Sequence, residues 1–501
     1  MTRMMSILQY KFPLFFIKRG QGSSIQFMQS KELGSIQIYN SLTDKKEDFV
    51  PINGNEVNMY TCGITVYDRS HIGHARSLYI FDVIRRYLKF RGFNVHFVRN
   101  ITDIDDKIID RAIETKREAH DVSEEQIRFY YEDLKALGVP PGDVEPKATD
   151  NIDGMITHIQ GLIDKGFAYA IPGADVYFDV RAFKDYGKLS GQSIDRMLEG
   201  VRVEKDSKKR DPLDFVLWKA SKPGEPTWDS PWGGGRPGWH IECSCMSMKH
   251  LHTQTLDIHA GGRDLIFPHH ENEIAQSEAL TGVPFAKYWI HHGLLTINGQ
   301  KMSKSSGNFI TIQDALAKYS VDEIKMFFLF SHYASNIDFS EEKILEARKA
   351  LGKFDVLFYR ASGLLKENEV EPVQAGFVSK YKHEFIQAMD DDFNTPKALA
   401  SLFNLINDTN LYIDQNADDP NYLGVIYHAV DVLESLARNI FCLFLQEKDK
   451  ELTDELKALL DERIQARELK NFKRSDELRA LLKEKGITVE DGKNGQSWRW
   501  I

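Results

Sequence analysis

The sequence predicts an α/β fold: a parallel-sheet domain interrupted by an insertion, followed by an all-helical bundle and a small C-terminal module. Three observations lead to this prediction. Residues 57–99 have a strand-helix-strand pattern, residues 150–235 lose that rhythm and become turn-rich, and apolar residues beyond about residue 340 recur at helical spacing. The chain has 501 residues, of which 42% are hydrophobic, so it is long enough for roughly three or four domains.

The first unit is a strand, a glycine-containing loop and a helix, followed at once by a second strand. The strands are VNMYTCG (57–63) and VHFVR (95–99), and the helical stretch HARSLYIFDVIRRYLKFRG between them stops at Gly92. A βαβ unit builds a parallel sheet, and such sheets bind ligands at the carboxyl ends of their strands. The site is therefore expected near residues 62–74 and 100–107.

The later segments follow the same order along the chain. Ser123 and Gln126 form a capping-box pattern at the helical stretch EEQIRFYYEDLKALG, which VPPGD (139–143) ends. Sheet-like patterning returns at TLDIHAGG (255–262), after a Gly/Pro-rich loop that closes the insertion. The stretches ALASLFNLINDTNLYI and DELKALLDERIQARELKNF then predict the bundle and the terminal module.

Composition limits the classes of function. The net charge of −10 argues against a protein that coats nucleic acid indiscriminately, although a local basic face such as Lys208–Arg210 could still steer a polyanion. No run of 18 or more apolar residues occurs, so no membrane span is predicted. The cysteines are too few and too scattered for a disulfide scaffold, which indicates a reducing, cytosol-like compartment: Cys62, Cys243, Cys245 and Cys442.

The first 31 residues contain basic residues and no acidic ones, and Pro13 breaks their short apolar run FPLFFI. This composition is typical of an organelle-targeting peptide. Alternatively, translation starts at Met28 and the printed start is over-long, which is the interpretation we prefer because ordered patterning begins at SIQIYNSL.

Two short motifs indicate the chemistry. HIGH (71–74), the first signature, places two histidines on one side of a helical turn, and Gly73 lets a flat ring or a phosphate approach the backbone. A helix N-terminus attracts anions, so His71 and His74 are expected to donate to phosphate oxygens. A lone His-x-x-His pair is more often structural or metal-binding.

KMSKS (301–305), the second signature, lies in the stretch KMSKSSGN. This stretch is either an exposed flexible loop or a clamp in which Lys301 and Lys304 meet a polyphosphate. Together and in this order, the two signatures favour displacement at the α-phosphate of ATP, where electrostatic stabilisation dominates.

The paired signatures resemble those of class I aminoacyl-tRNA synthetases. The stretches YTCGITVYDRSHIGHARS, RNITDIDDKII, GWHIECS, FPHHENEIAQSEA and KMSKSSGNF resemble the cysteinyl-tRNA synthetase family in its compact bacterial form, and the similarity runs from about residue 36 to the end. The resemblance implies a Rossmann-type catalytic domain in two halves (36–150 and 236–290) around a connective insertion (151–235). It implies, in addition, an N-terminal extension (1–35), a stem-contacting region with the KMSKS loop (291–350), a helical bundle (351–446) and an anticodon-binding module (447–501).

The activity implied by this resemblance is ATP-dependent ligation of L-cysteine to its tRNA through a cysteinyl-adenylate, with ATP and Mg²⁺ as the nucleotide substrate. His71, His74, Lys301 and Lys304 would stabilise the transition state, and Gly73, His74 and Lys304 would contact ATP. Two alternatives remain. A ligase that joins cysteine to an amino sugar would share the zinc site and both signatures without needing the helical tail, and a non-catalytic RNA-binding paralogue would not need intact signatures.

Four side chains are candidate metal ligands. His269 and Glu273, four apart in HHENE, lie on one helical face, and zinc accepts Cys, His and Glu ligands. The resemblance implies one zinc per chain, held by Cys62, Cys243, His269 and Glu273, that binds the sulfur of the substrate. Spacing alone does not choose His269 over His270 or Cys243 over Cys245. We interpret Cys245 and Cys442 as packing residues.

A zinc ion explains how cysteine is chosen over serine, because a soft thiolate outcompetes a hydroxyl on this metal and editing becomes unnecessary. The resemblance further implies that Thr102 and Trp239 line the amino-acid pocket and that His259 lies beside it. Core packing of Trp239 and turn capping by Thr102 are the alternatives. We interpret Asp103, Asp105 and Asp106 as a capping, solvated carboxylate run rather than a magnesium site.

The terminal module combines basic residues with Phe472, Trp498 and Trp500, a composition suited to stacking unpaired bases, although most aromatic residues in such a module belong to its core. The resemblance places the anticodon contacts at Arg467, Phe472, Asp476 and Asp491. Phe472 stands where some members of the family have tryptophan. We therefore expect a cytoplasmic monomer with tRNA, cysteine and ATP as partners and no membrane association, or an organelle-matrix protein if residues 1–31 are a transit peptide.

Overall fold

The computed structural model describes residues 34–194, 197, 209–302, 307–365, 370–444, 453–492 and 495–500, with the side chains of Lys301, Asp454, Glu468, residues 490–492 and residues 495–500 outside that description. The chain divides into two compact units. The large unit ends at Leu445, and the described part of the small unit begins at Thr453. Within the described residues, no helix is both long and apolar enough to cross a membrane.

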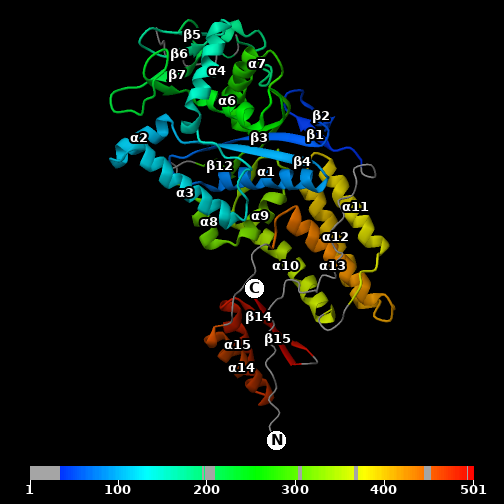
Figure 1. Ribbon diagram of the computed structural model, residues 1–501. Coiled ribbons are helices and arrows are strands. Elements are labelled where there is room, and N and C mark those ends of the chain that lie inside the picture. Colours follow the sequence, from blue (N-terminus) through cyan, green and yellow to red (C-terminus); the bar gives the residue numbers. More distant parts are fainter. Residues whose placement is uncertain are drawn as a thin grey trace. The chain divides into compact units, whose positions relative to one another are not determined.

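A four-stranded parallel sheet forms the centre of the large unit (Figure 1). Its strands are β3 (Glu56–Thr65), β4 (Asn94–Thr102), β9 (Leu256–Gly262) and β10 (Ala286–His292), in the spatial order β10-β9-β3-β4. The chain moves outward from β3 to β4 and later, in the opposite direction, from β9 to β10. The strand order therefore reverses between β3 and β9, and α/β sheets place their ligands at the carboxyl ends of such a pair.

Helices cover both faces of this sheet, as the βαβ pattern predicts. Helix α1 (Ile72–Phe90) joins β3 to β4 and lies on one face, while α6 (Trp239–Leu251) and α7 (Glu271–Thr281) lie on the other (Figure 1). Helix α1 ends where predicted, because Arg91 caps it and Gly92 adopts a φ of 91° that a side chain would disfavour. The predicted parallel βαβ unit is confirmed.

Two helices follow β4: α2 (Asp106–Thr115) and α3 (Ala119–Leu137). The capping box predicted at Ser123 is wrong. Helix α3 starts at Ala119, and the Ser123 hydroxyl donates to the His120 carbonyl within the helix, at 2.9 Å. The helix extends a turn earlier because Ala119 and Val122 are buried, and this apolar contact outweighs the capping preference.

The insertion consists of α4 (Ile152–Asp164) and an antiparallel sheet in the order β5-β6-β7-β8, with strands Ala168–Ala170, Val176–Phe178, Phe215–Ala220 and Gly235–Pro237. Its apolar side chains join the core of the sheet domain instead of forming a separate one. Met155 and Ile159 of α4 belong to the same buried cluster as Met246 of α6 and Ile274 of α7. The insertion therefore supports the helices that carry the candidate site.

A small sheet follows β10 and leads into the second signature. Its strands are β11 (Leu295–Ile297), β12 (Gln300–Lys301) and β13 (Ile337–Phe339), in the order β12-β11-β13. Helices α8 (Ile312–Lys318) and α9 (Val321–Leu329) lie between β12 and β13 in sequence, and capping boxes at Thr311 and Ser320 start them.

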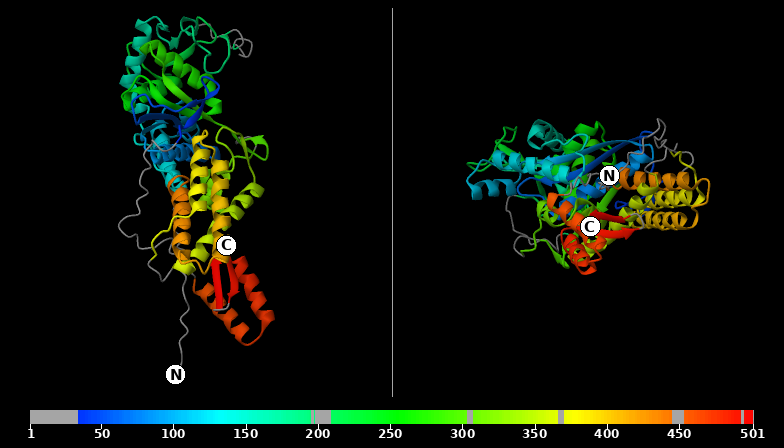
Figure 2. Two further views of the ribbon diagram at one scale, coloured as in Figure 1. Left: turned by 90° about the vertical axis from the view of Figure 1, so that its right-hand side faces the viewer. Right: turned by 90° about the horizontal axis from the view of Figure 1, so that it is seen from below.

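Four helices complete the large unit: α10 (Glu341–Leu365), α11 (Gly376–Asp390), α12 (Thr395–Gln415) and α13 (Tyr422–Asn439). Figures 1 and 2 show α11, α12 and α13 running side by side. The bundle is tied to α1, since the Tyr87 hydroxyl donates to the Asp390 carboxylate and the Tyr79 hydroxyl donates to the Phe441 carbonyl at 2.6 Å. A short hairpin, β1 (Gln37–Asn40) with β2 (Lys45–Asp48), precedes the central sheet.

The small unit has its own apolar core. It contains α14 (Asp454–Glu468), α15 (Phe472–Glu484) and an antiparallel hairpin of β14 (Ile487–Gly492) and β15 (Gly495–Trp500). The buried core side chains come from both helices and from β14: Leu456, Leu460, Leu482, Ile487 and Val489.

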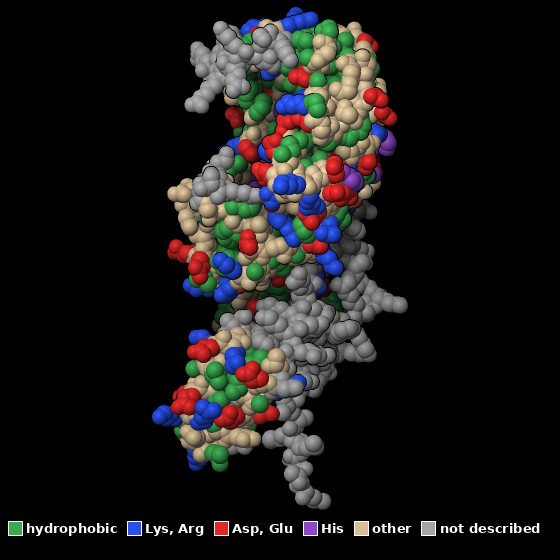
Figure 3. Space-filling view, turned by 90° about the vertical axis from the view of Figure 1, so that its left-hand side faces the viewer, with side chains coloured by type: hydrophobic (Ala, Val, Ile, Leu, Met, Phe, Trp, Pro, Cys, Tyr) green, Lys and Arg blue, Asp and Glu red, His purple; other side chains and the backbone are tan. Residues whose placement is uncertain are grey.

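Acidic and basic side chains are interspersed on the face shown in Figure 3. Surface ion pairs occur in both units, as in Arg117–Glu125 of the large unit and Arg474–Glu462 of the small unit, both at 2.8 Å. Pairing of this kind keeps the surface mixed in sign despite the net charge of −10.

Candidate active site

Cys62 lies near the carboxyl end of β3, at a bulge where the pairing register with β4 shifts between Thr61 and Ile64. The bulge depends on Gly63, because a Cβ at that position would lie 1.6 Å from the Asn100 carbonyl oxygen. The Gly63 N–H donates to the Asn100 side-chain oxygen at 2.7 Å, which fixes the backbone directly after Cys62. The close approach of two strands therefore aims the Cys62 thiol at the switch point of the sheet.

Cys243 reaches the same point from the second turn of α6. Its Sγ lies 3.8 Å from the Sγ of Cys62 and 3.7 Å from the Asn100 side-chain oxygen. One buried amide oxygen thus contacts both the Cys243 thiol and the backbone next to Cys62, so Asn100 orients the two sulfur atoms together.

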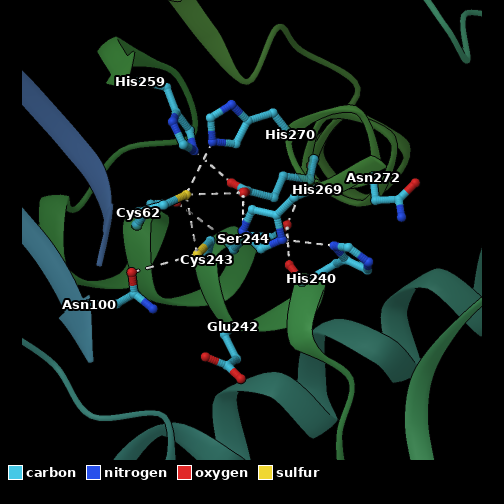
Figure 4. Close-up of polar contacts among 12 residues, drawn as sticks. Cys62, Asn100, His240, Glu242, Cys243, Ser244, His259, His269, His270 and Asn272 are labelled. Carbon is cyan, nitrogen blue, oxygen red and sulfur yellow. Dashed lines mark hydrogen bonds and ion pairs between the residues drawn. The ribbon is translucent and has the colours of Figure 1, made fainter. Parts of the chain in front are cut away.

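His269 and Glu273 complete the cluster from the start of α7, and Figure 4 shows His269 beside Cys243. The His269 Nε2 lies 2.9 Å from Glu273 Oε1, and the Cys62 Sγ lies 3.4 Å from the same oxygen. The predicted i, i+4 contact is present, although His269 itself stands in an irregular turn just before the helix. All four ligand atoms lie within 4.8 Å of one another.

This donor set fits a zinc ion by its chemistry. Burial and the neighbouring Cys243 thiol raise the pKa of the Cys62 thiol well above its ordinary value, and Glu273 adds to the rise. The pKa of the Cys243 thiol, in contrast, is lowered to about 6, because its burial is outweighed by hydrogen bonds with Cys62 and His269. A cation is therefore needed chiefly for the thiolate form of Cys62. Zinc takes Cys, His and Glu ligands and deprotonates coordinated thiols.

A second group within the described residues has similar geometry: Cys62, His259, His270 and Glu273. Its weak member is His259, whose Nε2 lies 2.6 Å from Glu273 Oε2 while its buried Nδ1 has no hydrogen-bond partner. In the first group, the Nδ1 of His269 lies 2.9 Å from a nitrogen of His240, which is the outer contact that a metal-bound imidazole normally has. The first group is therefore the better site.

The two other histidines act on the ligands from outside. His259 approaches Glu273, and the His270 Nε2 lies 3.2 Å from the Cys62 Sγ. His270 is itself held through Nδ1 by His291, whose other nitrogen meets the Ser41 hydroxyl, each contact at 2.8 Å. These contacts fix the orientation of the Cys62 thiol and of the Glu273 carboxylate.

The two remaining cysteines lie elsewhere. Cys245 is buried against Gly154 of α4, and burial raises the pKa of its thiol to about 11. Cys442 is buried at the end of the bundle, where its thiol donates to the Gly138 carbonyl at 3.1 Å. Neither belongs to a group of possible metal ligands among the described residues.

The residues predicted for the amino-acid pocket surround the cluster. The Trp239 ring stacks on His269 with its centroid 4.0 Å away, and 38% of the tryptophan is exposed, so it forms the open side of the cluster. His259 is fully buried and stacks on Trp289. The Thr102 hydroxyl, at the end of β4, donates to Glu242 at 2.6 Å.

The carboxylate run after β4 has three separate structural partners. Asp105 caps α2 by accepting from the Lys107 N–H, Asp103 accepts from the Thr149 N–H, and Asp106 pairs with Lys219 at 2.8 Å. Asp105 thus has the expected capping role, whereas the expectation of a solvated run is wrong for Asp103, which is buried.

The first signature forms the N-terminus of α1. His71 caps the helix, and its Nδ1 accepts from the N–H groups of Gly73 (3.1 Å) and His74 (3.3 Å). The His74 Nδ1 in turn accepts from the His71 N–H at 3.2 Å, and the two rings stack 3.7 Å apart. Because each Nδ1 accepts a hydrogen bond, each imidazole carries its proton on Nε2.

Burial keeps both imidazoles neutral at pH 7. It lowers the pKa of His71 to about 4 and that of His74 well below its ordinary value, with the neighbouring His71 contributing to the second shift. The pair therefore offers two N–H donors without positive charge, so any formal charge for a polyphosphate must come from other groups.

The second signature begins on β12 and only part of it is described. The backbone of Lys301 pairs with Thr296 of β11, whereas Lys304 lies outside the described residues. The segment after the signature returns to the first signature: the Ile72 N–H donates to Ile310 at 3.1 Å, and the His71 ring meets Phe309 edge-on. A Cβ on Gly73 would lie 3.6 Å from the end of the Met302 side chain. The two signatures are therefore neighbours.

The predicted anticodon residues lie in the small unit. Arg467 is in the last turn of α14, Asp476 is exposed on α15, and Phe472, at the first position of α15, is 59% exposed. Asp491 is in β14, and its side chain, like those of Trp498 and Trp500, lies outside the described part of the chain.

Sequence reasoning missed Asn100, His240 and His291, which support the ligands, and Glu242, which accepts from Thr102. His270 was considered only as an alternative ligand to His269. Asn100, His240, Glu242 and His270 stand in the motifs RNITDIDD, GWHIECS and FPHHENE, so their position beside the predicted ligands was the available signal. His291 carried no such signal, because only the pairing of β10 with β9 brings it to His270.

Comparison with known proteins identifies the family. A class I tRNA synthetase (C) catalytic-domain model matches residues 48–349, a DALR-domain model matches 384–462, and a cysteinyl-tRNA ligase anticodon-binding-domain model matches 449–499. A cysteine–tRNA ligase of Persephonella marina is 49% identical over 93% of this chain and 99% of its own length, and that of Aquifex aeolicus is 46% identical over the same shares.

Solved structures show the same fold at low identity. A Mycobacterium tuberculosis methionyl-tRNA synthetase in complex with methionyl-adenylate has a TM-score of 0.62 and 15% identity, covering 78% of this chain and 92% of that one. A leucyl-tRNA synthetase complex from Agrobacterium radiobacter has a TM-score of 0.58 and 11% identity, covering 79% and 85%. These matches favour neither an amino-sugar ligase nor a non-catalytic paralogue. Since one catalytic-domain model covers more than half of the residues and close relatives cover nearly all of them, the chain belongs to the cysteine–tRNA ligase family of class I aminoacyl-tRNA synthetases.

Proposed function

We propose that this chain ligates L-cysteine to its tRNA in two steps. The cysteine carboxylate attacks the α-phosphate of ATP and releases diphosphate, and the cysteinyl group of the adenylate then passes to the terminal ribose of the tRNA. The observation that carries the proposal is the cluster of Cys62, Cys243, His269 and Glu273 at the switch point of the sheet. The relatives named cysteine–tRNA ligase support the same activity.

Cys62, Cys243, His269 and Glu273 would hold one zinc ion. Bound there, zinc supplies a soft acceptor for the thiolate of the substrate, which the hydroxyl of serine does not match. Asn100, His240 and His270 orient the ligands, as their contacts with Cys243, His269 and Cys62 indicate.

The amino acid would lie against the cluster. Trp239 covers the open side over His269, and His259 closes the base through Glu273. Thr102 stands at the end of β4, where its hydroxyl is held by Glu242. In this pocket, the carboxylate of cysteine needs no base before it attacks, so catalysis rests on positioning and charge stabilisation.

ATP, with Mg²⁺, would lie at the N-terminus of α1. His71 and His74 present Nε2–H groups to the phosphates, and Gly73 permits close approach of the backbone. Because both imidazoles are neutral, Mg²⁺, Lys301 and Lys304 supply the positive charge that stabilises the departing diphosphate.

The tRNA would meet the small unit through its anticodon, with Arg467, Phe472, Asp476 and Asp491 as contacts. The exposed ring of Phe472 supports stacking on a base. We further propose that the enzyme acts as a monomer in the cytoplasm or, alternatively, in an organelle matrix.

Cysteine-dependent exchange of labelled diphosphate into ATP, followed by charging of total tRNA, tests the proposal. Exchange that requires cysteine and is absent with serine, together with charging of one tRNA species, is the expected outcome. Exchange without charging of any tRNA would contradict the second step. No exchange with cysteine in the zinc-loaded protein would contradict the first.

A further inference from the structure

A fully buried guanidinium lies one turn into α1, two residues after the first signature. Arg76 has no exposed surface, and its two terminal nitrogens donate to four backbone carbonyls. One nitrogen contacts Gly293 at 2.7 Å and Leu294 at 3.1 Å, and the other contacts Tyr333 at 3.0 Å and Ser335 at 2.6 Å. No carboxylate is among these four partners, so the side chain serves as a clamp on the backbone and not as half of an ion pair.

The four carbonyls belong to two chain segments that start the small sheet. Gly293 and Leu294 directly precede β11, and residues 333–335 directly precede β13. The two segments also bond to each other, through Gly293 N–H to the Tyr333 carbonyl at 2.9 Å and Leu294 N–H to the Asn336 side chain at 2.8 Å. A Cβ on Gly293 would lie 2.3 Å from the Ser335 backbone, so the segments are as close as glycine allows.

This junction sets the place of the strand on which the second signature begins. Strand β11 turns into β12 through Asn298 and Gly299, which have the positive φ values (49° and 75°) of a tight hairpin. Asp338 of β13 accepts from the Thr296 hydroxyl and from the Gly299 N–H, each at 2.6 Å. The hairpin is thus fixed to β13, and through both segments to Arg76.

The other end of the second signature returns to the same helix start. The Ile72 N–H donates to Ile310, and the Ile312 N–H donates to the Ser70 carbonyl at 2.9 Å. The start of α1 therefore holds the chain on both sides of the signature: residues 70–72 hold the segment that leaves it, and Arg76 holds the segment that enters it.

We propose that Arg76 is a positioning residue that sets the distance between the first signature and strand β12, from which the second signature begins. This inference rests on the proposed function, in which both signatures act on the same ATP phosphates. Arginine suits the task because its planar fork directs several N–H groups at fixed angles, which the single ammonium of lysine does not do. A displacement of about 1 Å between catalytic groups lowers the reaction rate by on the order of 100-fold.

The test compares Arg76→Gln and Arg76→Lys with Arg85→Gln, a matched control on the same helix. Arg85 is also buried and donates to a backbone carbonyl, that of Pro141, but it pairs with Asp143 away from the small sheet. Cysteine-dependent diphosphate exchange gives kcat and the KM values for ATP and cysteine. Bound zinc and amide hydrogen exchange over residues 293–301, β3 and β9 are measured on the same full-length samples.

We expect Arg76→Gln to lower kcat by about 100-fold while the KM for cysteine stays within about twofold and zinc remains bound. Amides of residues 293–301 should exchange faster, with β3 and β9 unchanged. Arg76→Lys should be intermediate, and Arg85→Gln should resemble the wild type in both kcat and the exchange of residues 293–301.

A kcat within about twofold of the wild type in Arg76→Gln would overturn the proposal. Equal loss of protection in β3 and β9 would also overturn it, because Arg76 would then be a general folding residue. If Arg76→Gln does not accumulate as folded protein, Arg76→Lys decides by the same measurements. Absence of cysteine-dependent exchange in the wild type would instead contradict the proposed function, and local loss of protection at residues 293–301 would still support the clamp.

Discussion

The proposed zinc site and the proposed anticodon contacts differ in how the chain holds them. Three of the four proposed ligands are buried, and the four come from β3, α6 and the start of α7, so several packed elements fix them together. Phe472 and Asp476, in contrast, project from one helix of a small unit with its own core. The first arrangement is preorganised for a small ligand, whereas the second exposes an aromatic ring and a carboxylate on the surface, where a large ligand can reach them.

Removing the small unit should have the largest effect, because it separates the function of the buried site from that of the exposed contacts. A chain that ends at residue 446 keeps the cluster and the first signature, so we expect cysteine-dependent diphosphate exchange within about twofold of the wild type. Charging of tRNA should fall by about 1,000-fold, or about 4 kcal/mol, because anticodon contacts are lost. Both rates are measured on one preparation.

The separate apolar cores of the two units make this truncation a fair test. Charging by the truncated chain at the wild-type rate would show that the small unit does not contribute to tRNA charging. Loss of diphosphate exchange would show that the two units are not independent.

Replacing one ligand tests the buried region. In Cys243→Ser, a hard hydroxyl replaces a thiolate, so we expect zinc to fall from about one per chain towards zero and the KM for cysteine to rise about 100-fold, or about 3 kcal/mol. Metal content is measured by atomic emission after dialysis, and cysteine affinity by diphosphate exchange.

Cys245→Ser is the matched control, since Cys245 is a buried cysteine of the same helix whose thiol faces α4. It should retain its zinc and its affinity for cysteine. Full zinc content in Cys243→Ser would move the site to the overlapping group with His259 and His270, and His270→Ala would then be expected to remove the metal.

Much of the candidate site could be predicted from the sequence, because its motifs stand near the ends of strands. Cys62 stands near the carboxyl end of the first strand of a βαβ unit, and a parallel sheet must bring that end to the switch point. The choice of Cys243 over Cys245 could not be made from spacing, because it depends on which face of α6 meets β3. The structure makes that choice through Asn100, which contacts Cys243 and the backbone beside Cys62.

Other features of the fold could not be predicted from local sequence patterns. The start of α3 was misplaced because burial of Ala119 and Val122 is a tertiary property. Arg76 looked like an ordinary helix residue, since its four partners lie more than 200 positions away in the sequence. Long-range pairing of this kind leaves no periodic pattern, whereas the strands and helices that it joins do.

Replacing the ring of Phe472 tests whether the exposed region stacks on a base. Phe472→Ala should weaken tRNA binding by roughly 1–3 kcal/mol if the ring stacks on a base. Leu481→Ala is the control, because Leu481 is also an exposed apolar residue of α15 (36%) but lies nine positions away, on the opposite side of the helix. Binding is measured by filter retention at several salt concentrations, and an equal loss in both variants would point to the stability of the unit instead of stacking.

The smallest effect concerns pH and belongs to the buried region. His158 of α4 is buried with its Nε2 3.3 Å from the Gln276 carbonyl, and burial lowers its pKa to about 4 from its ordinary value of 6.5. Between those two values the unfolded chain binds a proton that the folded chain does not bind. The contribution to stability is therefore fully present above pH 6.5 and is lost as the pH falls, by about 1.4 kcal/mol per pH unit.

The amide of His158→Gln can still donate to Gln276 but does not titrate, so the fall in the free energy of unfolding between pH 6 and pH 5 should shrink by about that amount. Urea unfolding followed by tryptophan fluorescence measures the change, with His120→Gln, which removes an exposed imidazole from α3, as the control. An unchanged slope in His158→Gln would mean that α4 opens to solvent before the core unfolds, and the insertion would then be less firmly joined to the site than its shared core indicates.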